Sequence, residues 1–142
     1  QVLKYRKKIS GPLLDRIDIQ ISVPRETVQT RVEQSSENIA KIKRSIEAAR
    51  TIQSERFSGT VMLTNTDISY RNIDKYCRLT TAAEHLASQA VNTQKLSLRA
   101  YHKIKKLGRT IADLEQSELV HDNHIAEAVS LRLQERTLTD LA

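Results

Sequence analysis

Only one segment of this chain has the two-residue alternation of a β-strand. Between residues 17 and 23, isoleucine or valine alternates with polar residues, which is the pattern of a strand with one buried face. A single strand is not stable by itself, because its backbone hydrogen bonds need a neighbouring strand. We therefore expect a piece of a longer protein, and the opening on Gln1 instead of Met agrees with this expectation.

The remainder of the chain has the pattern of a helical domain. Only two of its three glycines and neither of its two prolines lie beyond residue 25, so few breakers interrupt this region. Apolar residues recur there every three or four positions. We expect helices at about 37–57, 67–77, 80–92, 97–115 and from about 122 onward.

The expected helices carry several signals of their ends and their contacts. Thr80 or Thr81 and Ser97 are of the residue types that cap helix N-termini. A glycine inside a helix costs about 1 kcal/mol relative to alanine, so Gly108 predicts the close approach of a neighbouring helix. Cys77 is interpreted as a small core residue. In the first helix the helical spacing is carried by Ile39, Ile42, Ile46 and Ala49. The fourth helix is expected to bury one face, made of Tyr101, Ile104, Ile111 and Leu114.

The charge balance favours an anionic partner. Lys and Arg number 23 against 17 Asp and Glu, for a net charge of +6, so a nucleic-acid surface, a phosphate site and a solvated basic face are all open. A basic helical DNA-binding module is one alternative, and a protein-interaction adaptor is another. The basic residues that support the first are Lys103, Lys105, Lys106 and Arg109, although they spread over more than one helical face.

Several kinds of site lack their sequence signatures. No glycine is followed by lysine, so the chain holds no Walker-type phosphate loop. The single cysteine and four histidines make a weak case for zinc, and the pair His121 and His124 has more often a capping or exposed role. No run of about 20 apolar residues is present to span a membrane. The lone cysteine cannot form an internal disulfide, which agrees with a cytoplasmic protein.

Two arginines stand out on physical grounds. Arg99 comes two residues after the expected cap Ser97, at the positive end of the helix dipole, where a cation is unfavourable unless an anion is present. Either a bound anion or an acidic neighbour would account for it. Arg16 lies directly before the alternating segment, and its simplest interpretation is a salt bridge to Asp15 or Asp18.

Four motifs in order along the chain resemble the magnesium-chelatase-like AAA+ ATPases, in the bacterial branch of ComM and YifB. The first is residues 5–19, with the sequence YRKKISGPLLDRIDI. The second is ARTIQSER at 49–56, similar to the family pattern A-R-x-x-Q-x-x-R. The third joins LSLRAYH at 96–102 to RTIADL at 109–114, and HIAEA at 124–128 agrees with the helix that follows. The similarity spans nearly the whole chain.

The resemblance implies a mainly α fold: the helical C-terminal lid of an AAA+ protein, preceded by a remnant strand of its α/β core. Residues 1–30 would be the core remnant and 31–142 the lid. Arg16 matches the arginine finger, which touches the γ-phosphate of a neighbouring protomer. Arg99 matches sensor 2, which touches the nucleotide of its own protomer. The secondary candidates are Arg50, Gln53 and Arg109.

The same resemblance implies partners and a cofactor. The parent protein would bind ATP and Mg²⁺, whereas this piece alone would bind neither. Its partners would be the missing ATP-binding core, neighbouring protomers in a ring, expected to be a hexamer, and DNA during branch migration. The chain departs from the family pattern at Lys103, where arginine is usual, at Gly108 and at 130–132. The resemblance therefore carries no family contact over to residue 103 or to 130–132.

Overall fold

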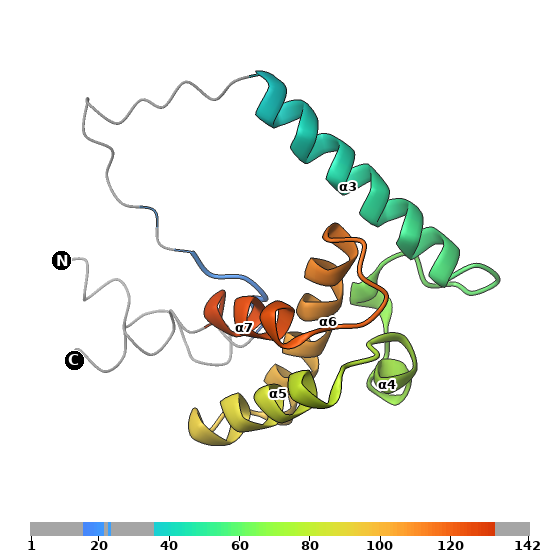
Figure 1. The fold of residues 1–142 in the computed structure, drawn as a ribbon. Coiled ribbons are helices and arrows are strands. Elements are labelled where there is room, and N and C mark those ends of the chain that lie inside the picture. Colours follow the sequence, from blue (N-terminus) through green and yellow to red (C-terminus); the bar gives the residue numbers. More distant parts are fainter. Residues whose placement is uncertain (1–15, 22, 24–35, 133–142) are drawn as a thin grey trace, which may run out of the picture.

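The computed structural model describes residues 16–21, 23 and 36–132, and this part is mainly helical (Figure 1). The predicted α class is confirmed for these residues. The remaining positions of the expected core remnant, 1–15, 22 and 24–30, lie outside the described residues. The elements in chain order are α3 (Ser36–Arg56), the 3-10 turns η2 (Asn65–Asp67) and η3 (Tyr70–Asn72), α4 (Ile73–Tyr76), α5 (Thr81–Thr93), α6 (Leu98–Leu114) and α7 (Asp122–Ser130).

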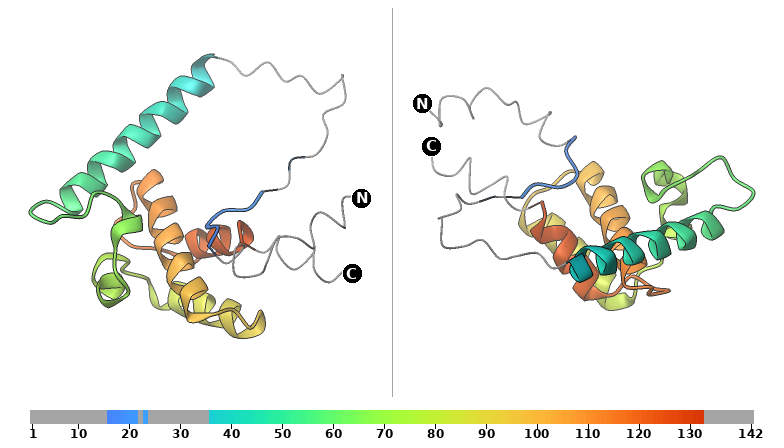
Figure 2. Two further views of the ribbon diagram at one scale, coloured as in Figure 1. Left: turned by 180° about the vertical axis from the view of Figure 1, so that it is seen from behind. Right: turned by 90° about the horizontal axis from the view of Figure 1, so that it is seen from above.

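The helix α6 is the centre of the fold. It packs against α3 along one side and against α5 and α7 along the other (Figures 1 and 2). Its residues Ile104 and Ala112 are fully buried, together with Ile125 and Ala128 of α7 and Ala83 of α5. The core is therefore aliphatic, as expected from a chain with only one phenylalanine and no tryptophan.

The predicted caps begin the two central helices. The Thr80 hydroxyl accepts a hydrogen bond from the amide of Ala83, at 3.2 Å, at the start of α5. The Ser97 hydroxyl accepts one from the amide of Ala100, at 3.1 Å, at the start of α6. Each bond satisfies an amide that has no partner within the helix, so both helix starts predicted from the sequence are confirmed.

Gly108 lies where α6 touches α7, as predicted. A Cβ atom at this position would come within 2.8 Å of Ile125 Cδ1 and 3.3 Å of Val120 Cγ1. The residue is buried in the middle of α6. The absence of a side chain at position 108 therefore sets how closely the two helices approach.

The helix predicted at about 37–57 is confirmed as α3, but most of its apolar stripe is uncovered. Ile39, Ile42 and Ile46 are 49% to 60% exposed, and only Ala49 of that face is buried. The cause is visible in Figures 1 and 2, where the N-terminal half of α3 extends beyond the bundle. Leu114, at the end of α6, is also 39% exposed instead of buried.

The predicted strand is not found in its described residues, 17–21 and 23. No described strand runs beside this segment to provide a ladder of hydrogen bonds. It lies as extended chain against the helices instead, with the Gln20 amide donating to the Leu131 carbonyl at 2.9 Å. Ile21 and Val23 are 67% and 80% exposed, so their apolar face has no cover among the described residues.

The region 67–77, predicted as one helix, consists of 3-10 turns followed by the short α4. The Asp67 carboxylate accepts the amides of Leu63 and Thr64, each at 2.9 Å, and so closes a tight turn before a longer helix can begin. Cys77 is buried beside Phe57, Ile68 and Ile73. Its interpretation as a core residue is confirmed.

Candidate functional site

Arg99 is the second residue of α6 and its side chain points into solvent. The first turn of this helix contains no acidic residue. Within the part of the chain that the structure describes, no carboxylate pairs with the Arg99 guanidinium. An acidic neighbour, one of the two explanations for a cation at this position, is therefore absent from the described residues.

Arg16 is also exposed, but its backbone is held. The Arg16 carbonyl accepts a hydrogen bond from Lys103 Nζ on α6, at 2.7 Å. The same amine forms an ion pair with Asp18 Oδ1, at 2.8 Å. Asp18 is thus engaged by Lys103, whereas Asp15, the other carboxylate considered for Arg16, lies outside the described residues.

Contacts from the end of α7 hold the rest of the segment 16–21. The Gln20 amide donates to the Leu131 carbonyl, and the Arg132 guanidinium donates to the Ile17 carbonyl at 3.3 Å. The segment therefore lies across α6 and the chain that follows α7, as Figure 2 shows. A cavity of about 320 Å³ separates part of it from α6, lined by Asp18, Ile19, Asn65, Thr66, Lys103, Lys106, Leu107 and Thr110.

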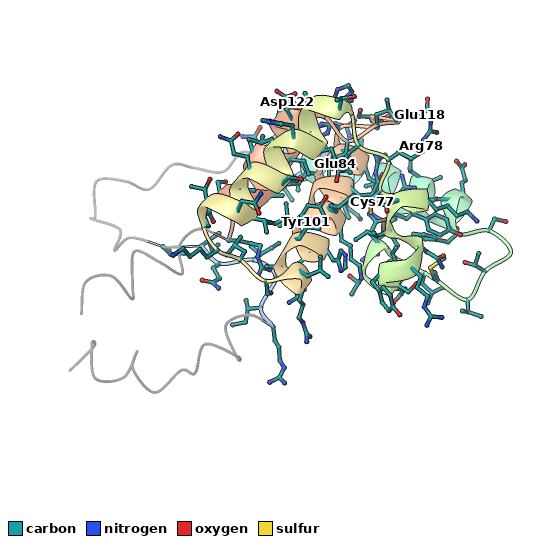
Figure 3. All side chains as sticks on the ribbon, turned by 90° about the horizontal axis from the view of Figure 1, so that it is seen from below. Cys77, Arg78, Glu84, Tyr101, Glu118 and Asp122 are labelled. Atoms are coloured by element: carbon teal, nitrogen blue, oxygen red, sulfur yellow. The ribbon has the colours of Figure 1, made fainter. Side chains whose placement is uncertain are left out.

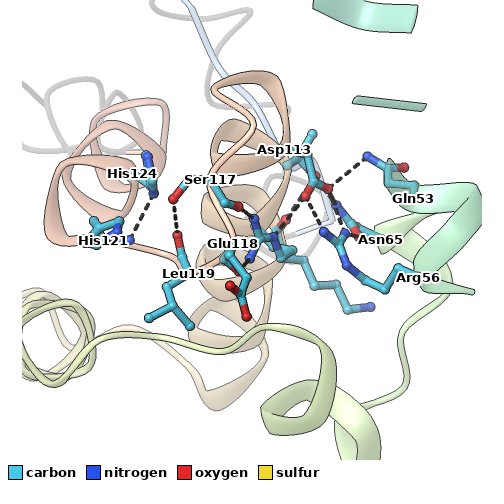
Figure 4. Close-up of polar contacts among 12 residues, drawn as sticks. Gln53, Arg56, Asn65, Asp113, Ser117, Glu118, Leu119, His121 and His124 are labelled. Atoms are coloured by element: carbon cyan, nitrogen blue, oxygen red, sulfur yellow. Dashed lines mark hydrogen bonds and ion pairs between the residues drawn. The ribbon is translucent and has the colours of Figure 1, made fainter. Parts of the chain in front are cut away.

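A buried polar cluster joins α3 to α6 around the carboxylate of Asp113 (Figure 4). Arg56 donates to both carboxylate oxygens, and its contact to Oδ2 measures 2.8 Å. Asn65 Nδ2 also donates to Oδ2, at 2.8 Å, and Arg109 Nε donates to Oδ1 at 3.1 Å. We call these residues the Asp113 cluster: Gln53, Arg56, Asn65, Arg109 and Asp113.

The Asp113 cluster keeps its carboxylate ionised inside the protein. Burial by itself raises the pKa of Asp113, but hydrogen bonds from Arg56 and Asn65 and the charge of Arg109 lower it more, so the net pKa is below its ordinary value. Arg109 also donates from Nη1 to the Glu118 carbonyl, at 2.7 Å. This second bond ties the loop after α6 to the cluster.

The secondary candidates occupy two kinds of position. Gln53 and Arg109 are brought together in the Asp113 cluster, with Gln53 Nε2 donating to Asp113 at 3.2 Å. Arg50 is exposed and lines a second cavity of about 320 Å³ between α3, η2 and α6. Arg56, Asn65 and Asp113 are not among the residues predicted from the sequence, although Arg109 and Asp113 have the four-residue spacing of a helical ion pair.

Lys105 is buried in a second polar cluster. It contacts Glu84 and the ring of Tyr101, and these two residues are labelled in Figure 3. Its amine contacts Asp74 Oδ1 at 2.7 Å and Glu84 Oε2 at 3.1 Å. The Tyr101 hydroxyl also donates to Glu84. Burial alone lowers the pKa of Lys105, but the hydrogen bonds from its amine to Asp74 and Glu84 outweigh this effect and raise it. Lys105 therefore stays charged and paired.

These contacts change the interpretation of the basic residues on α6. Lys105 and Arg109 are 3% and 1% exposed. Lys106 donates to the Thr66 carbonyl at 2.8 Å, and Lys103 is bound to the segment 16–21. The four residues that support a DNA-binding helix are thus engaged by other parts of this chain.

The histidine pair acts at the start of α7. His124 Nδ1 accepts a hydrogen bond from the His121 amide at 2.9 Å, and Nε2 lies 2.9 Å from Glu115 Oε2. Because Nδ1 is an acceptor, Nε2 carries the proton and donates it to Glu115. This is the capping role considered in the sequence analysis. No set of three potential ligands for a metal ion is found within residues 16–21, 23 and 36–132.

Comparisons with known proteins agree with the order of the motifs. Residues 26–132 match the family model described as magnesium chelatase, subunit ChlI C-terminal. The chain belongs to this magnesium chelatase C-terminal family. Residues 1–31 match the model of magnesium chelatase, subunit ChlI, so the chain includes the junction between the two family regions. Across the described residues, no helix has the length and apolar character needed to cross a membrane.

Members of the magnesium chelatase family with curated sequences are considerably longer. The chain is 34% identical over its whole length to the competence protein ComM of Haemophilus influenzae. It is 31% identical to the YifB protein of Escherichia coli, over 99% of its length. It is 25% identical to a Mycobacterium bovis protein, Mb2921c, over 91%. The chain spans only about 28% of the length of the first two relatives.

Proposed function

We propose that this chain is the lid-bearing C-terminal part of a cytoplasmic AAA+ ATPase that works as a ring and remodels DNA. In this proposal Arg16 is the arginine finger that reaches the ATP of a neighbouring protomer. Arg99 is the sensor 2 residue, which contacts the nucleotide of its own protomer. ATP and Mg²⁺ would be bound by the core of the longer protein, since this chain has no Walker loop.

The observation that carries the proposal is the state of the two arginines. Both guanidiniums are exposed, and within residues 16–21, 23 and 36–132 neither has a carboxylate partner. Arg56 and Arg109, by contrast, form ion pairs with the carboxylate of Asp113. A free, planar guanidinium binds phosphate oxygens through two hydrogen bonds, and phosphoryl transfer builds negative charge on the γ-phosphate oxygens. Arg16 and Arg99 have the chemistry that such a site needs.

Exposed apolar residues support the proposal that another domain of the longer protein packs against this chain. Three isoleucines of α3 and those of the segment 17–21 are exposed, an arrangement that favours burial against another surface. The three in α3 are Ile39, Ile42 and Ile46. The ATP-binding core of the longer protein is the partner we assign to these exposed isoleucines. It would supply the sheet beside residues 17–23 that the alternating pattern predicts.

The substrate class rests on the relatives and on charge. One relative is named a competence protein, and the chain carries a net charge of +6. We therefore assign DNA, remodelled by branch migration, to the ring. The alternative of a free-standing DNA-binding module is less well supported, because its four basic residues make contacts within the chain.

Arg50, Gln53 and Arg109 keep secondary roles in this proposal. Arg50 is the exposed member, at the edge of a cavity, and could approach a nucleotide directly. Gln53 and Arg109 would act through the Asp113 cluster, by keeping α3 and α6 in register.

The first test measures ATP turnover by the longer protein that contains this chain. Arg16→Ala and Arg99→Ala should each leave the helical circular dichroism unchanged, and loss of a true finger should lower turnover on the order of 10³-fold. Arg44→Ala, which removes an exposed arginine from α3, is the matched control and should retain turnover. Near-normal turnover in a folded Arg99→Ala ring would contradict the sensor assignment.

Mixed rings separate the two arginine roles. An Arg16→Ala protomer keeps an intact nucleotide pocket, and a Walker-loop mutant keeps its own Arg16. Where the two protomers are neighbours, the intact pocket of the first can meet the intact Arg16 of the second. Such subunit boundaries should recover turnover. A mixture of Arg99→Ala with the Walker-loop mutant should stay inactive, because no pocket in that ring is complete. Recovery in the second mixture would instead assign Arg99 to the neighbour's nucleotide.

DNA binding by the present chain tests the alternative function. A free-standing module would bind duplex DNA with an affinity that falls steeply with salt. We expect weak binding at about 0.15 M salt. Tight binding that is lost on Lys106→Gln would favour the DNA-binding module over the lid.

A further inference from the structure

Lys103 is the residue that connects the segment of Arg16 to the helix of Arg99. Its amine contacts the Arg16 carbonyl at 2.7 Å and the Asp18 carboxylate at 2.8 Å. The Lys103 side chain is 16% exposed, so it lies largely between these partners and α6. We propose that Lys103 is a positioning residue that fixes the finger segment to the lid helix, an inference that rests on the proposed function of Arg16.

The contact from Lys103 holds Arg16 by its backbone and leaves its side chain exposed. Lys103 binds the backbone carbonyl of Arg16, not its guanidinium. A lysine amine has three donors, so it can hold this carbonyl and the Asp18 carboxylate together. The guanidinium of Arg16 stays exposed and available for an anion outside this chain.

Lys103 also lies close to Arg99 on α6. Arg99 and Lys103 are four residues apart in one helix, so they lie on the same face, one turn from each other. A helix moves as a rigid unit over such a distance. Any rotation of α6 that follows a change at Arg99 would therefore also displace the carbonyl of Arg16.

Contacts from α7 complete the attachment of the segment. The Gln20 amide is bound to the Leu131 carbonyl and the Ile17 carbonyl to Arg132, so the residues on either side of Asp18 are also held by the two residues that follow α7. Among the contacts that the structure describes, the one to Arg16 itself comes from Lys103. Lys103 thus sets the position of the finger, and the α7 contacts set the direction of the chain behind it.

The experiment uses the longer protein with three substitutions. Lys103→Met removes the charge and keeps the apolar stem, and Lys103→Arg keeps donors for both contacts. Lys106→Met is the matched control, because Lys106 is on the same helix and also donates to a backbone carbonyl, that of Thr66. Hydrogen exchange of the peptide covering residues 16–21 reports on the attachment, and steady-state ATP hydrolysis reports on function.

We expect Lys103→Met to increase exchange in 16–21 by roughly three- to tenfold, as for the loss of a partly exposed charged contact. Its kcat should fall by about tenfold or more while KM for ATP changes little, because the finger acts in the transition state. Mixed with a Walker-loop mutant, it should recover turnover as Arg16→Ala does. Lys103→Arg should retain both the low exchange and the turnover, and Lys106→Met should change neither.

Two results would overturn the inference. In the first, Lys103→Met changes neither the exchange of 16–21 nor kcat, although Arg16→Ala is inactive. The finger would then keep its position without the contact from Lys103. The other is a loss of turnover in Lys103→Met without any increase in exchange. Increased exchange in Lys103→Met together with normal turnover in Arg16→Ala would uphold the attachment and overturn the proposed function instead.

Discussion

Arg109 and Asp113 lie one turn apart on α6 and form a 3.1 Å ion pair inside the protein, with side chains 1% and 0% exposed. Arg56 adds a second guanidinium to the same carboxylate from α3. One motif of the chain, ARTIQSER, thus meets another, RTIADL, at a single buried anion. The contact between α3 and α6 is consequently polar at its centre.

The first prediction concerns the charge of Asp113. Asp113→Asn should destabilise the fold by about 3 kcal/mol, because breaking a buried ion pair leaves its cations without compensation. Urea unfolding followed by circular dichroism measures the effect. Glu47→Gln is the matched control, since Glu47 forms an exposed i,i+4 pair with Lys43. This control should cost under about 0.5 kcal/mol, and equal losses in the two variants would contradict the prediction.

The lowered pKa of Asp113 predicts a dependence of stability on pH. Asp113 has its ordinary pKa of 3.8 in the unfolded chain and a lower one in the folded protein. The contribution is therefore complete above about pH 4 to 5 and is lost as the pH falls below 3.8 toward the folded value. Urea midpoints between about pH 6 and pH 3 should decrease less steeply in Asp113→Asn than in the original chain. Parallel curves would show that Asp113 does not titrate with folding.

The third prediction concerns the α6 and α7 contact at Gly108. Gly108→Val should destabilise the fold by about 2 kcal/mol, because its side chain would meet Ile125 and Val120 in a filled core. Ile125→Ala should relieve part of this cost when the two changes are combined, so the double variant should be less unstable than the sum predicts. Gln89→Val, on the exposed side of α5, is the control. Strict additivity would contradict the close approach.

Cys77 should be unreactive in the folded protein. Burial raises the pKa of its thiol to about 11, whereas the reactive form is the thiolate. Alkylation by iodoacetamide at about pH 8 should be at least about 100-fold slower in the folded chain than in urea, from the pKa difference alone. Mass spectrometry of the labelled chain gives both rates. Comparable rates would show that the site opens readily or that the thiol is exposed.

The present chain alone should not hydrolyse ATP. It lacks the Walker loop and the Ser or Thr that holds Mg²⁺ there. A phosphate-release assay on purified chain should give the same rate as an Arg99→Ala version, which serves as the control for contaminating enzymes. Turnover that is present in the chain and lost in Arg99→Ala would contradict this prediction.

The sequence by itself determined where the long helices begin and that a neighbouring helix approaches Gly108. Helical spacing and the capping residues Thr80 and Ser97 act over a few positions, so the start of α5 and the start of α6 could be predicted from neighbours alone. Gly108 likewise predicted a close helix contact, because glycine is unfavourable inside a helix and is expected there mainly where a neighbouring helix leaves no room for a side chain. The family motifs are also the source of the proposed roles of Arg16 and Arg99, which stay predictions.

The tertiary structure decided which charged residues form contacts within the fold and which remain exposed to solvent. Arg56 and Asp113 are separated by 57 positions in the chain, and no local pattern reports that they meet. The same holds for Lys103 and the carbonyl of Arg16, 87 positions apart. The apolar stripe of α3 follows the same rule, because periodicity shows that a face is apolar but only packing decides what covers it. Ile42 is accordingly 60% exposed, because α3 extends beyond the helices it packs against.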